Sequence, residues 1–152
     1  MSDKYAPLRL EHQLCFPLYA ASKEIVRRYK PLLDPLDLTY TQYITMMAMW
    51  EHQSLSVSEL GECLYLNSAT LTPVLKRLES KGYISRRRST EDERSVIVSI
   101  TPAGMKLQDE ALQVPYAMGT CVNIEQGEAL KLKQLLDKLL DSFEQEDRKS
   151  VV

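Results

Sequence analysis

Three cysteines are the residues of this chain that could carry chemistry. Cys15, Cys63 and Cys121 lie far apart in the sequence, and no CxxC pair or HExxH motif accompanies them. The two histidines, His12 and His52, have no obvious metal-binding partners, so we predict no metal site and no cofactor. A cysteine thiolate is a nucleophile toward a peroxide, but a single cysteine on an apolar helix face is usually inert core. The residues alone leave Cys15 open between these two roles.

Positive charge is concentrated in one segment, from Lys76 to Arg88. Six basic residues lie there against a single acidic one, so the segment carries +5 in a chain of net charge −2, which leaves about −7 for the rest. The overall composition does not force such a patch, so it indicates a surface that binds a polyanion. The basic residues are Lys76, Arg77, Lys81, Arg86, Arg87 and Arg88.

Residues 56–80 predict two helices joined by a short turn. Ser56 and Glu59 have the spacing of a capping box, which begins the first helix. Asn67 or Ser68 caps the second helix, where apolar residues recur at i, i+3, i+4 and i+7. The apolar faces are Val57, Leu60 and Leu64 on the first helix and Leu71, Val74, Leu75 and Leu78 on the second. The outer face of the second helix is small, polar and basic, which suits contact with DNA, and consists of Ala69, Thr70, Thr72, Pro73, Lys76, Arg77 and Ser80.

A β-hairpin is predicted after these helices. Gly82 ends the second helix, and the alternation of apolar residues over 96–100 indicates a strand that pairs with one near Ile84. The charged segment between the strands is too long for a two-residue turn and should project as a loop. The helices and hairpin over 41–101 predict a winged helix-turn-helix that binds DNA. The alternative is an ordinary helical hairpin with a solvated charge run.

Two helices are predicted on the N-terminal side of this lobe. Residues 8–30 carry an apolar stripe, and Pro17 inside it is expected to kink the helix. A connection rich in Pro and Asp over 31–39 leads to a second helix, which opens at Thr41 and ends near His52. Its Met, Ile and Trp side chains are expected in the core.

Further helices are predicted after the hairpin. Thr101 caps a helix with Pro102 at its first position, and this helix is interrupted around Pro115 and Gly119. A last helix runs from about Glu125 to Phe143. Its broad apolar face consists of Leu132, Leu135, Leu136, Leu139, Leu140 and Phe143.

The flanking helices carry more apolar surface than one winged helix needs. We therefore expect residues 8–35 and 102–145 to be dimerisation helices that pack against a second copy as a symmetric homodimer. Two recognition helices one turn of DNA apart would then read a palindrome. The expected fold is mainly α with a small β wing, as a single domain over 1–152.

Nothing in the sequence suggests a membrane or secreted protein. No apolar run approaches the roughly 18 residues of a membrane helix. The N-terminal segment contains no signal-peptide core, and three scattered cysteines are too few for a disulfide framework. We expect a cytoplasmic protein without a membrane partner.

The order of these elements resembles the MarR family of bacterial regulators, and Asp92 to Arg94 matches that family's D-x-R wing motif. More narrowly, LEHQLCFPLYAASKE, YKPLLDPLDLTYTQY, WEHQSLSVSELGE, LNSATLTPVLKRLE and RRRSTEDERSV resemble the organic hydroperoxide regulators, OhrR. The resemblance implies a repressor that leaves its pseudo-palindromic double-stranded operator when an organic hydroperoxide oxidises Cys15. It also implies that Tyr29 and Tyr40 approach the sulfur from the other subunit, with Tyr19 nearby.

The resemblance also gives Cys121 a role. Some members of the family have one reactive cysteine and use a small thiol, whereas others have a second, resolving cysteine in this region. Cys121 matches the second kind and would form a disulfide with Cys15 of the partner subunit. The alternative is that a small thiol reacts with oxidised Cys15. Cys121 would then be a small buried hydrophobic residue. Cys63, inside the short helix, is expected in the core.

DNA contacts are expected from the second helix and from the wing. The segment 67–80 would enter the major groove, and Arg94, held by Asp92, would reach a narrow minor groove. Lys76 and Arg86 are expected on phosphates. The full set of expected DNA-binding residues is Asn67, Ser68, Thr70, Thr72, Lys76, Arg77, Arg86, Arg88, Asp92 and Arg94.

Three functions remain open at this point. The first is the redox-responsive repressor, and the second is a MarR-type regulator released by a phenolic or other small ligand, with Cys15 only packing. The third is a thiol peroxidase, which is weakest because a peroxidase needs no basic wing and no other catalytic group accompanies the cysteine. We therefore predict that the protein is not an enzyme.

Overall fold

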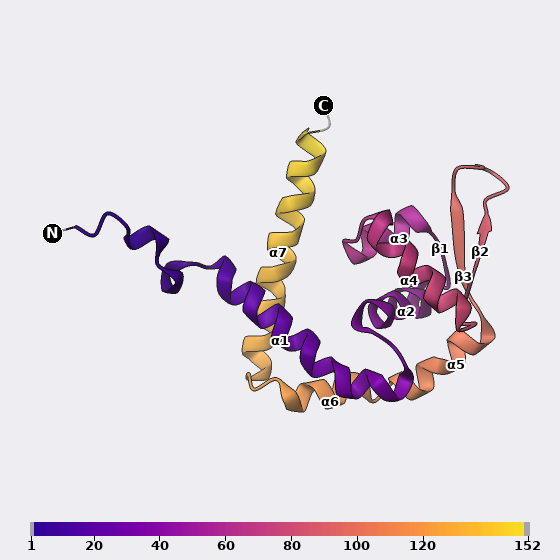
Figure 1. The fold of residues 1–152 in the computed structure, drawn as a ribbon, viewed down its shortest axis with the longest axis horizontal. Helices are drawn as coiled ribbons and strands as arrows, with labels where there is room; N and C mark the ends of the chain where they lie inside the picture. Colours follow the sequence, from indigo (N-terminus) through magenta and orange to yellow (C-terminus); the bar gives the residue numbers. More distant parts are fainter. Residues whose placement is uncertain (1, 151–152) are drawn as a thin grey trace. The chain divides into compact units, whose positions relative to one another are not determined.

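The computed structural model describes residues 2–150 (Figure 1). The chain divides into two compact units, residues 1–118 and residues 119–152, and each is described by itself. None of the helices in the described residues is long and apolar enough to cross a membrane.

The first long helix begins later than predicted. Two short 3₁₀ turns, Ala6–Leu8 and Leu10–His12, precede α1, which runs from Cys15 to Leu33. Pro17 therefore lies in the first turn of α1, where its missing N–H would have no helical acceptor, so it starts the helix instead of kinking it. The helix also continues through Pro31 into the segment expected to be a connection.

The second helix, α2 (Tyr40–His52), begins one residue before the predicted Thr41. Thr39 is its N-cap and forms a capping box with Gln42. Met46 and Met49 are fully buried, as predicted, but Met47 is 44% exposed, so its assignment to the core was wrong.

The helix-turn-helix is confirmed in detail. In α3 (Val57–Leu64), Glu59 N donates to Ser56 Oγ at 3.0 Å, and Ser56 N donates to Glu59 Oε1 at 3.1 Å. Asn67 caps α4 (Ser68–Ser80). The inward face of α4 is buried at Leu71, Leu75 and Leu78.

The wing is the antiparallel pair β2 (Ile84–Arg88) and β3 (Val96–Ile100). Gly82, at φ +82°, ends α4 in a Schellman motif, in which Tyr83 N donates to the Leu78 carbonyl. A third strand, β1 (Ser54–Ser56), pairs with β3 and was not predicted, because three residues are too short to show a period.

The remaining helices are α5 (Pro102–Ala111), α6 (Val114–Cys121) and α7 (Gln126–Ser150). Thr101 caps α5 with Pro102 at its first position, as predicted. The interruption near Pro115 is confirmed at residues 112–113, but Gly119 lies inside α6 without a break. Helix α7 extends beyond its predicted end at Phe143.

Candidate functional site

The outer face of α4 presents the polar and basic side chains assigned to DNA. Exposed positions on it are Ser68, Thr70, Lys76 and Arg77. Two of the side chains predicted to contact DNA also form hydrogen bonds with the backbone of α4. Asn67 Oδ1 accepts from Thr70 N at 2.8 Å, and Thr72 Oγ1 donates to the Ser68 carbonyl at 2.6 Å. Asn67 therefore caps the helix, and the face is exposed at both ends, with Thr72 half-buried between them.

The loop between β2 and β3 forms the tip of the wing (Figure 1), and hydrogen bonds of Asp92 shape the turn that carries Arg94. Asp92 Oδ1 accepts from the backbone N–H of Arg94 at 3.0 Å, and Ser95 N donates to the Asp92 carbonyl at 2.9 Å. Asp92 thus fixes the backbone at Arg94, while the Arg94 side chain is exposed. This geometry agrees with the predicted role of Asp92 as a support for Arg94.

The basic residues of the 76–88 segment fall into two groups. Lys76, Arg77, Arg87 and Arg88 are exposed. Lys81 instead donates to the carbonyl of Asp37 and to Gln42 Oε1, and Arg86 forms an ion pair with Glu79 at 3.1 Å. Arg86 is the predicted DNA-binding residue whose placement differs most from the expectation, because its guanidinium is engaged within the protein.

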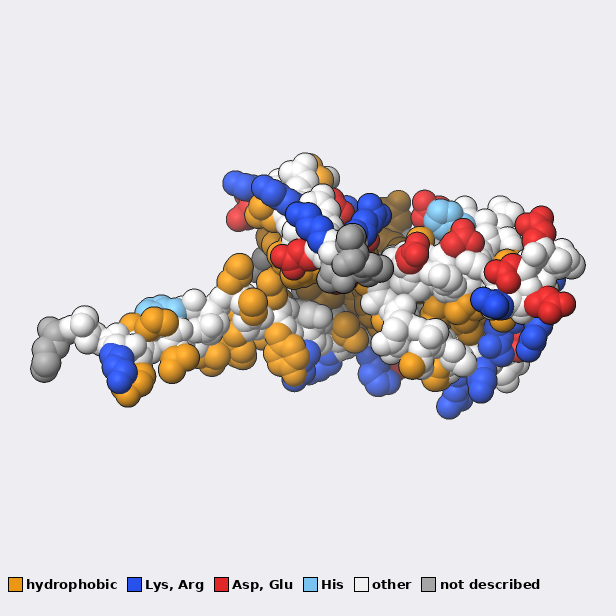
Figure 2. Space-filling view, turned by 90° about the horizontal axis from the view of Figure 1, so that it is seen from above, with side chains coloured by type: hydrophobic (Ala, Val, Ile, Leu, Met, Phe, Trp, Pro, Cys, Tyr) orange, Lys and Arg blue, Asp and Glu red, His pale blue; other side chains and the backbone are white. Residues whose placement is uncertain are grey.

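Cys15 is the first residue of α1 and is exposed. The residues around it are unusually apolar for a surface: Leu8, Leu10, Leu14 and Phe16 are 79%, 59%, 75% and 43% exposed. Figure 2 shows hydrophobic side chains along this N-terminal extension, at the left of the view. These apolar side chains are uncovered in a single chain, but the predicted stripe along one helix over residues 8–30 is wrong at its start, because Leu8, Leu10 and Leu14 precede α1.

Tyr29 and Tyr40 come together, from α1 and from the start of α2. Their ring centroids are 4.9 Å apart, and Tyr43 joins them, at 5.7 Å from Tyr29. Burial raises the pKa of all three phenols, and for Tyr29 the neighbouring Tyr40 and Tyr43 raise it further. These hydroxyls therefore keep their protons at neutral pH and can donate hydrogen bonds. Tyr43 was not predicted to belong to this group.

Cys15 cannot contact Tyr29 of its own chain. The two residues lie on one helix, fourteen positions apart, which corresponds to about 21 Å at 1.5 Å per residue. Tyr19, in contrast, is one turn from Cys15 and 62% exposed, with Lys23 Nζ at 5.1 Å from its ring centroid. The structure thus places Tyr19 beside Cys15 and keeps the pair Tyr29–Tyr40 at the other end of α1.

The other two cysteines differ from each other. Cys121 is the last residue of α6 and is partly exposed, within the second unit. Cys63 is exposed, so its assignment to the core was wrong. In the short helix α3 the inward positions are taken by Leu60 and Leu64, which leaves Cys63 on the outside, with its Sγ 4.0 Å from His52 Nε2.

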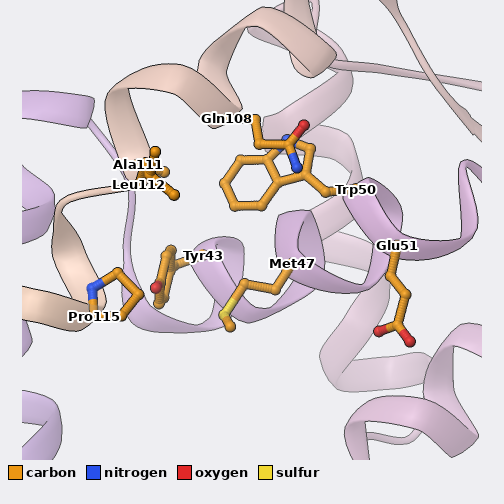
Figure 3. A pocket seen from close by; sticks show the side chains of 8 residues that line it. All are labelled: Tyr43, Met47, Trp50, Glu51, Gln108, Ala111, Leu112 and Pro115. Atoms are coloured by element: carbon orange, nitrogen blue, oxygen red, sulfur yellow. The ribbon is translucent and has the colours of Figure 1, made fainter.

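An apolar pocket between α2 and α5 was not predicted from the sequence (Figure 3). Its volume is about 280 Å³, and Trp50 lies along it, with its Nε1 donating to the Gly104 carbonyl at 2.8 Å. The lining residues are Tyr43, Met47, Trp50, Glu51, Gln108, Ala111, Leu112 and Pro115. The pocket joins segments far apart in sequence, which no local pattern reveals.

Comparison with known proteins agrees with this geometry. Residues 27–111 match the family described as transcriptional regulator SarA/Rot. The organic hydroperoxide resistance transcriptional regulator of Bacillus subtilis (strain 168) is 48% identical over 150 residues, which covers 97% of this chain and 100% of that protein.

Solved structures of AbfR from Staphylococcus epidermidis are also similar. Reduced AbfR bound to DNA is 31% identical with a TM-score of 0.79, covering 94% of this chain and 98% of that chain. Disulfide-formed AbfR is 35% identical with a TM-score of 0.62, covering 90% and 96%. The similarity spans nearly the whole chain in each case.

Proposed function

The chain belongs to the MarR family of transcriptional regulators, and we propose that it is an organic hydroperoxide-sensing repressor that leaves its operator when Cys15 is oxidised. It is a regulator and not an enzyme. The observation that carries the sensing role is the position of Cys15. It is exposed within the uncovered apolar N-terminal extension, about 21 Å along α1 from Tyr29 of its own chain.

A second subunit completes the sensor site. Dimers are typical of this family, and an exposed apolar surface of this size marks an interaction site. The N-terminal extension of one subunit covers apolar surface of the other and brings Cys15 to Tyr29 and Tyr40 of that subunit. On the second unit, α7 presents a further apolar face for the same dimer. It comprises Leu132, Leu135, Leu139 and Phe143, all at least 37% exposed.

The chemistry at Cys15 then follows from the neighbouring groups. The protonated hydroxyls of Tyr29 and Tyr40 donate to the sulfur and favour the thiolate. The thiolate attacks the terminal oxygen of the hydroperoxide, the O–O bond breaks, and an alcohol leaves after taking up a proton, while sulfur becomes a sulfenic acid. Exposed Leu14 and Phe16, which flank Cys15 in the sequence, favour an alkyl peroxide over hydrogen peroxide.

Replacing either sensor tyrosine should slow oxidation. Tyr29→Phe and Tyr40→Phe each remove one donor to the thiolate, and a hydrogen bond to a charged group contributes about 1.5 kcal/mol, or about tenfold in rate. The measurement is stopped-flow loss of titratable thiol after addition of cumene hydroperoxide. Tyr83→Phe, which changes a partly buried tyrosine of the DNA-binding lobe, is the control. Oxidation at the wild-type rate in both sensor variants would place the activating groups elsewhere.

On DNA, α4 enters the major groove and the wing reaches the adjacent minor groove. The proposed contacts are Asn67, Ser68, Thr70, Thr72, Lys76, Arg77, Arg88 and Arg94, with Asp92 as support. A narrow minor groove concentrates negative potential, which attracts an inserted arginine such as Arg94.

Arg94→Ala should weaken operator binding by about 1–3 kcal/mol, the range of one specific contact. Lys76→Ala should instead weaken binding to all sequences alike and reduce the dependence of affinity on salt, because it removes one phosphate contact. Fluorescence anisotropy with operator and non-operator duplexes at several salt concentrations measures both effects. Unchanged operator affinity in a folded Arg94→Ala protein would contradict the wing assignment.

Cys121 is proposed as the resolving cysteine. Its thiolate attacks the sulfenic sulfur of Cys15 in the partner subunit, the S–O bond breaks, and water leaves as the disulfide forms. Two observations support the proposal: Cys121 is partly exposed, and a similar regulator, AbfR, exists in a disulfide form.

The pocket of Figure 3 supports one alternative function, release by a small apolar ligand. The two functions are separated by following operator binding while one equivalent of cumene hydroperoxide, or an excess of salicylate, is added. Redox release should require the hydroperoxide and be reversed by dithiothreitol alone. Release by salicylate that is reversed by dialysis without a reductant would favour the ligand-responsive regulator.

A further inference from the structure

Arg86 points away from the solvent-facing side of the wing. Along β2 the side chains alternate, so Arg86 shares a face with fully buried Ile84, whereas Arg87 is on the opposite, exposed face. The Arg86 side chain is 24% exposed, and its Nε atom is buried without a hydrogen-bond partner within the described residues. A side chain enclosed in this way is poorly placed to meet a phosphate.

One carboxylate holds Arg86 by two hydrogen bonds. Glu79 Oε1 accepts from Arg86 Nη2 at 3.1 Å, and Glu79 Oε2 accepts from the backbone N–H of Arg86, also at 3.1 Å. Glu79 is in the last turn of α4, and Arg86 is in the middle of β2, opposite buried Val98 of β3. The pair therefore joins the recognition helix to the hairpin across the turn at Gly82.

Both members of the Glu79–Arg86 pair are charged at neutral pH. The hydrogen bond from Arg86 lowers the pKa of Glu79, so the carboxylate remains ionised throughout the neutral range. It is also the one acidic residue among the six basic ones of the 76–88 segment. An acidic side chain at a DNA-binding surface weakens binding to phosphates, so its presence calls for a structural reason.

We propose that Glu79 and Arg86 position the wing relative to α4, so that both elements engage one operator at the same time. Arg86 is then a positioning residue and not a phosphate contact. Specific binding needs α4 in the major groove while Arg94 lies in the adjacent minor groove, and a loosened wing would have to be ordered on binding. Non-specific binding depends on total charge and tolerates a loosened wing. The inference rests on the proposed DNA-binding role of α4 and the wing.

Electrostatics and positioning predict opposite results for Glu79→Ala. Loss of a negative charge alone would tighten binding to every duplex. Loss of the positioning contact should weaken operator binding about tenfold, at the low end of one specific contact, and leave non-operator binding equal or slightly tighter. Glu91→Ala is the matched control, because it removes the same charge from the exposed wing loop, where no side-chain bond of Glu91 is found in the described residues.

Arg86→Lys gives a second, independent comparison. Lysine keeps the charge but lacks the planar fork of the guanidinium. A phosphate contact would survive this change, whereas a positioning role predicts a loss of operator affinity that is smaller than in Glu79→Ala, because the backbone N–H of residue 86 still donates to Glu79. The double variant Glu79→Ala/Arg86→Ala should lose no more operator affinity than Glu79→Ala alone, because Glu79→Ala already removes both hydrogen bonds that join the two residues.

The experiment measures dissociation constants for each variant by fluorescence anisotropy. The probes are a duplex selected from a random library by the wild-type protein and an unselected duplex of equal length. Circular dichroism verifies folding, and Arg86→Lys keeps the test valid if Glu79→Ala does not fold. Tighter binding of Glu79→Ala to both duplexes, or wild-type operator affinity in Arg86→Lys, would overturn the positioning role. If the wild-type protein selects no duplex, the proposed function itself fails, which is a different result.

Discussion

A Cys15→Ser protein should remain on its operator after peroxide is added, under conditions in which the wild-type protein dissociates. Serine is nearly isosteric with cysteine, but its hydroxyl is not oxidised by a hydroperoxide. Cys15 is at the start of α1, outside the DNA-binding lobe, so this conservative substitution should change operator affinity in the reduced state by no more than about twofold. The loss of response should therefore be complete, with folding, dimerisation and DNA binding retained.

Cys63→Ser is the matched control for this experiment. Cys63 is also an exposed thiol, and His52 lies beside it, so it is the competing site of oxidation. The control protein should release DNA at the wild-type rate, as followed by anisotropy after addition of cumene hydroperoxide. Release of Cys15→Ser at the wild-type rate would show that another cysteine senses the peroxide.

Cys121→Ser should abolish the covalent dimer that peroxide produces in the wild-type protein. On a non-reducing gel, oxidised wild type and Cys63→Ser should migrate as dimers that dithiothreitol converts to monomers, while Cys121→Ser stays monomeric. Without a resolving thiol, Cys15 should stop at the sulfenic acid and then pass to sulfinic and sulfonic acids, which the reductant does not reverse. Intact mass spectrometry measures these added oxygens.

A different outcome would show that a small thiol, and not Cys121, reacts with oxidised Cys15. If oxidised wild type remains monomeric on the gel and gains the mass of a small thiol on Cys15 when one is supplied, Cys121 is not the resolving residue. Cys121 would then be a packing residue at the end of α6.

A disulfide between the subunits also offers a physical route to DNA release. The Cα atoms of a disulfide lie within about 7 Å of each other, so its formation sets a strict distance between α1 of one subunit and α6 of the other. These helices belong to the proposed dimerisation region, which sets the spacing of the two α4 helices. A displacement of several ångströms there misplaces one α4 relative to its half-site.

Local signals in the sequence were sufficient for the DNA-binding lobe. The capping box at Ser56, the period of apolar residues through Leu71 and Leu78, and Gly82 each determine structure within a few residues. The predicted start of the first helix, at residue 8, was wrong because Pro17 was interpreted as an interruption in the middle of a helix. The structure shows that it occupies the first turn.

The site could be predicted only in part, because much of it depends on contacts distant in sequence. Resemblance to a family assigned Tyr29 and Tyr40, but nothing in the pattern showed that Tyr43 completes their cluster. The partner of Arg86 was equally hidden, because Glu79 reaches it only after the chain reverses at Gly82. Burial of Cys63 was predicted incorrectly, since a cysteine beside a leucine gives no indication of which side of a short helix it occupies.

The most direct test titrates the operator-bound wild-type protein with cumene hydroperoxide, from well below one equivalent per subunit upward. The fraction of DNA still bound and the oxidation state of Cys15, by peptide mass spectrometry, are measured in the same samples. We expect the two curves to coincide, with DNA released as Cys15 is converted to its sulfenic or disulfide form. Release of DNA while Cys15 remains a thiol, or full conversion of Cys15 to those forms with the operator still bound, would contradict a repressor controlled by this cysteine.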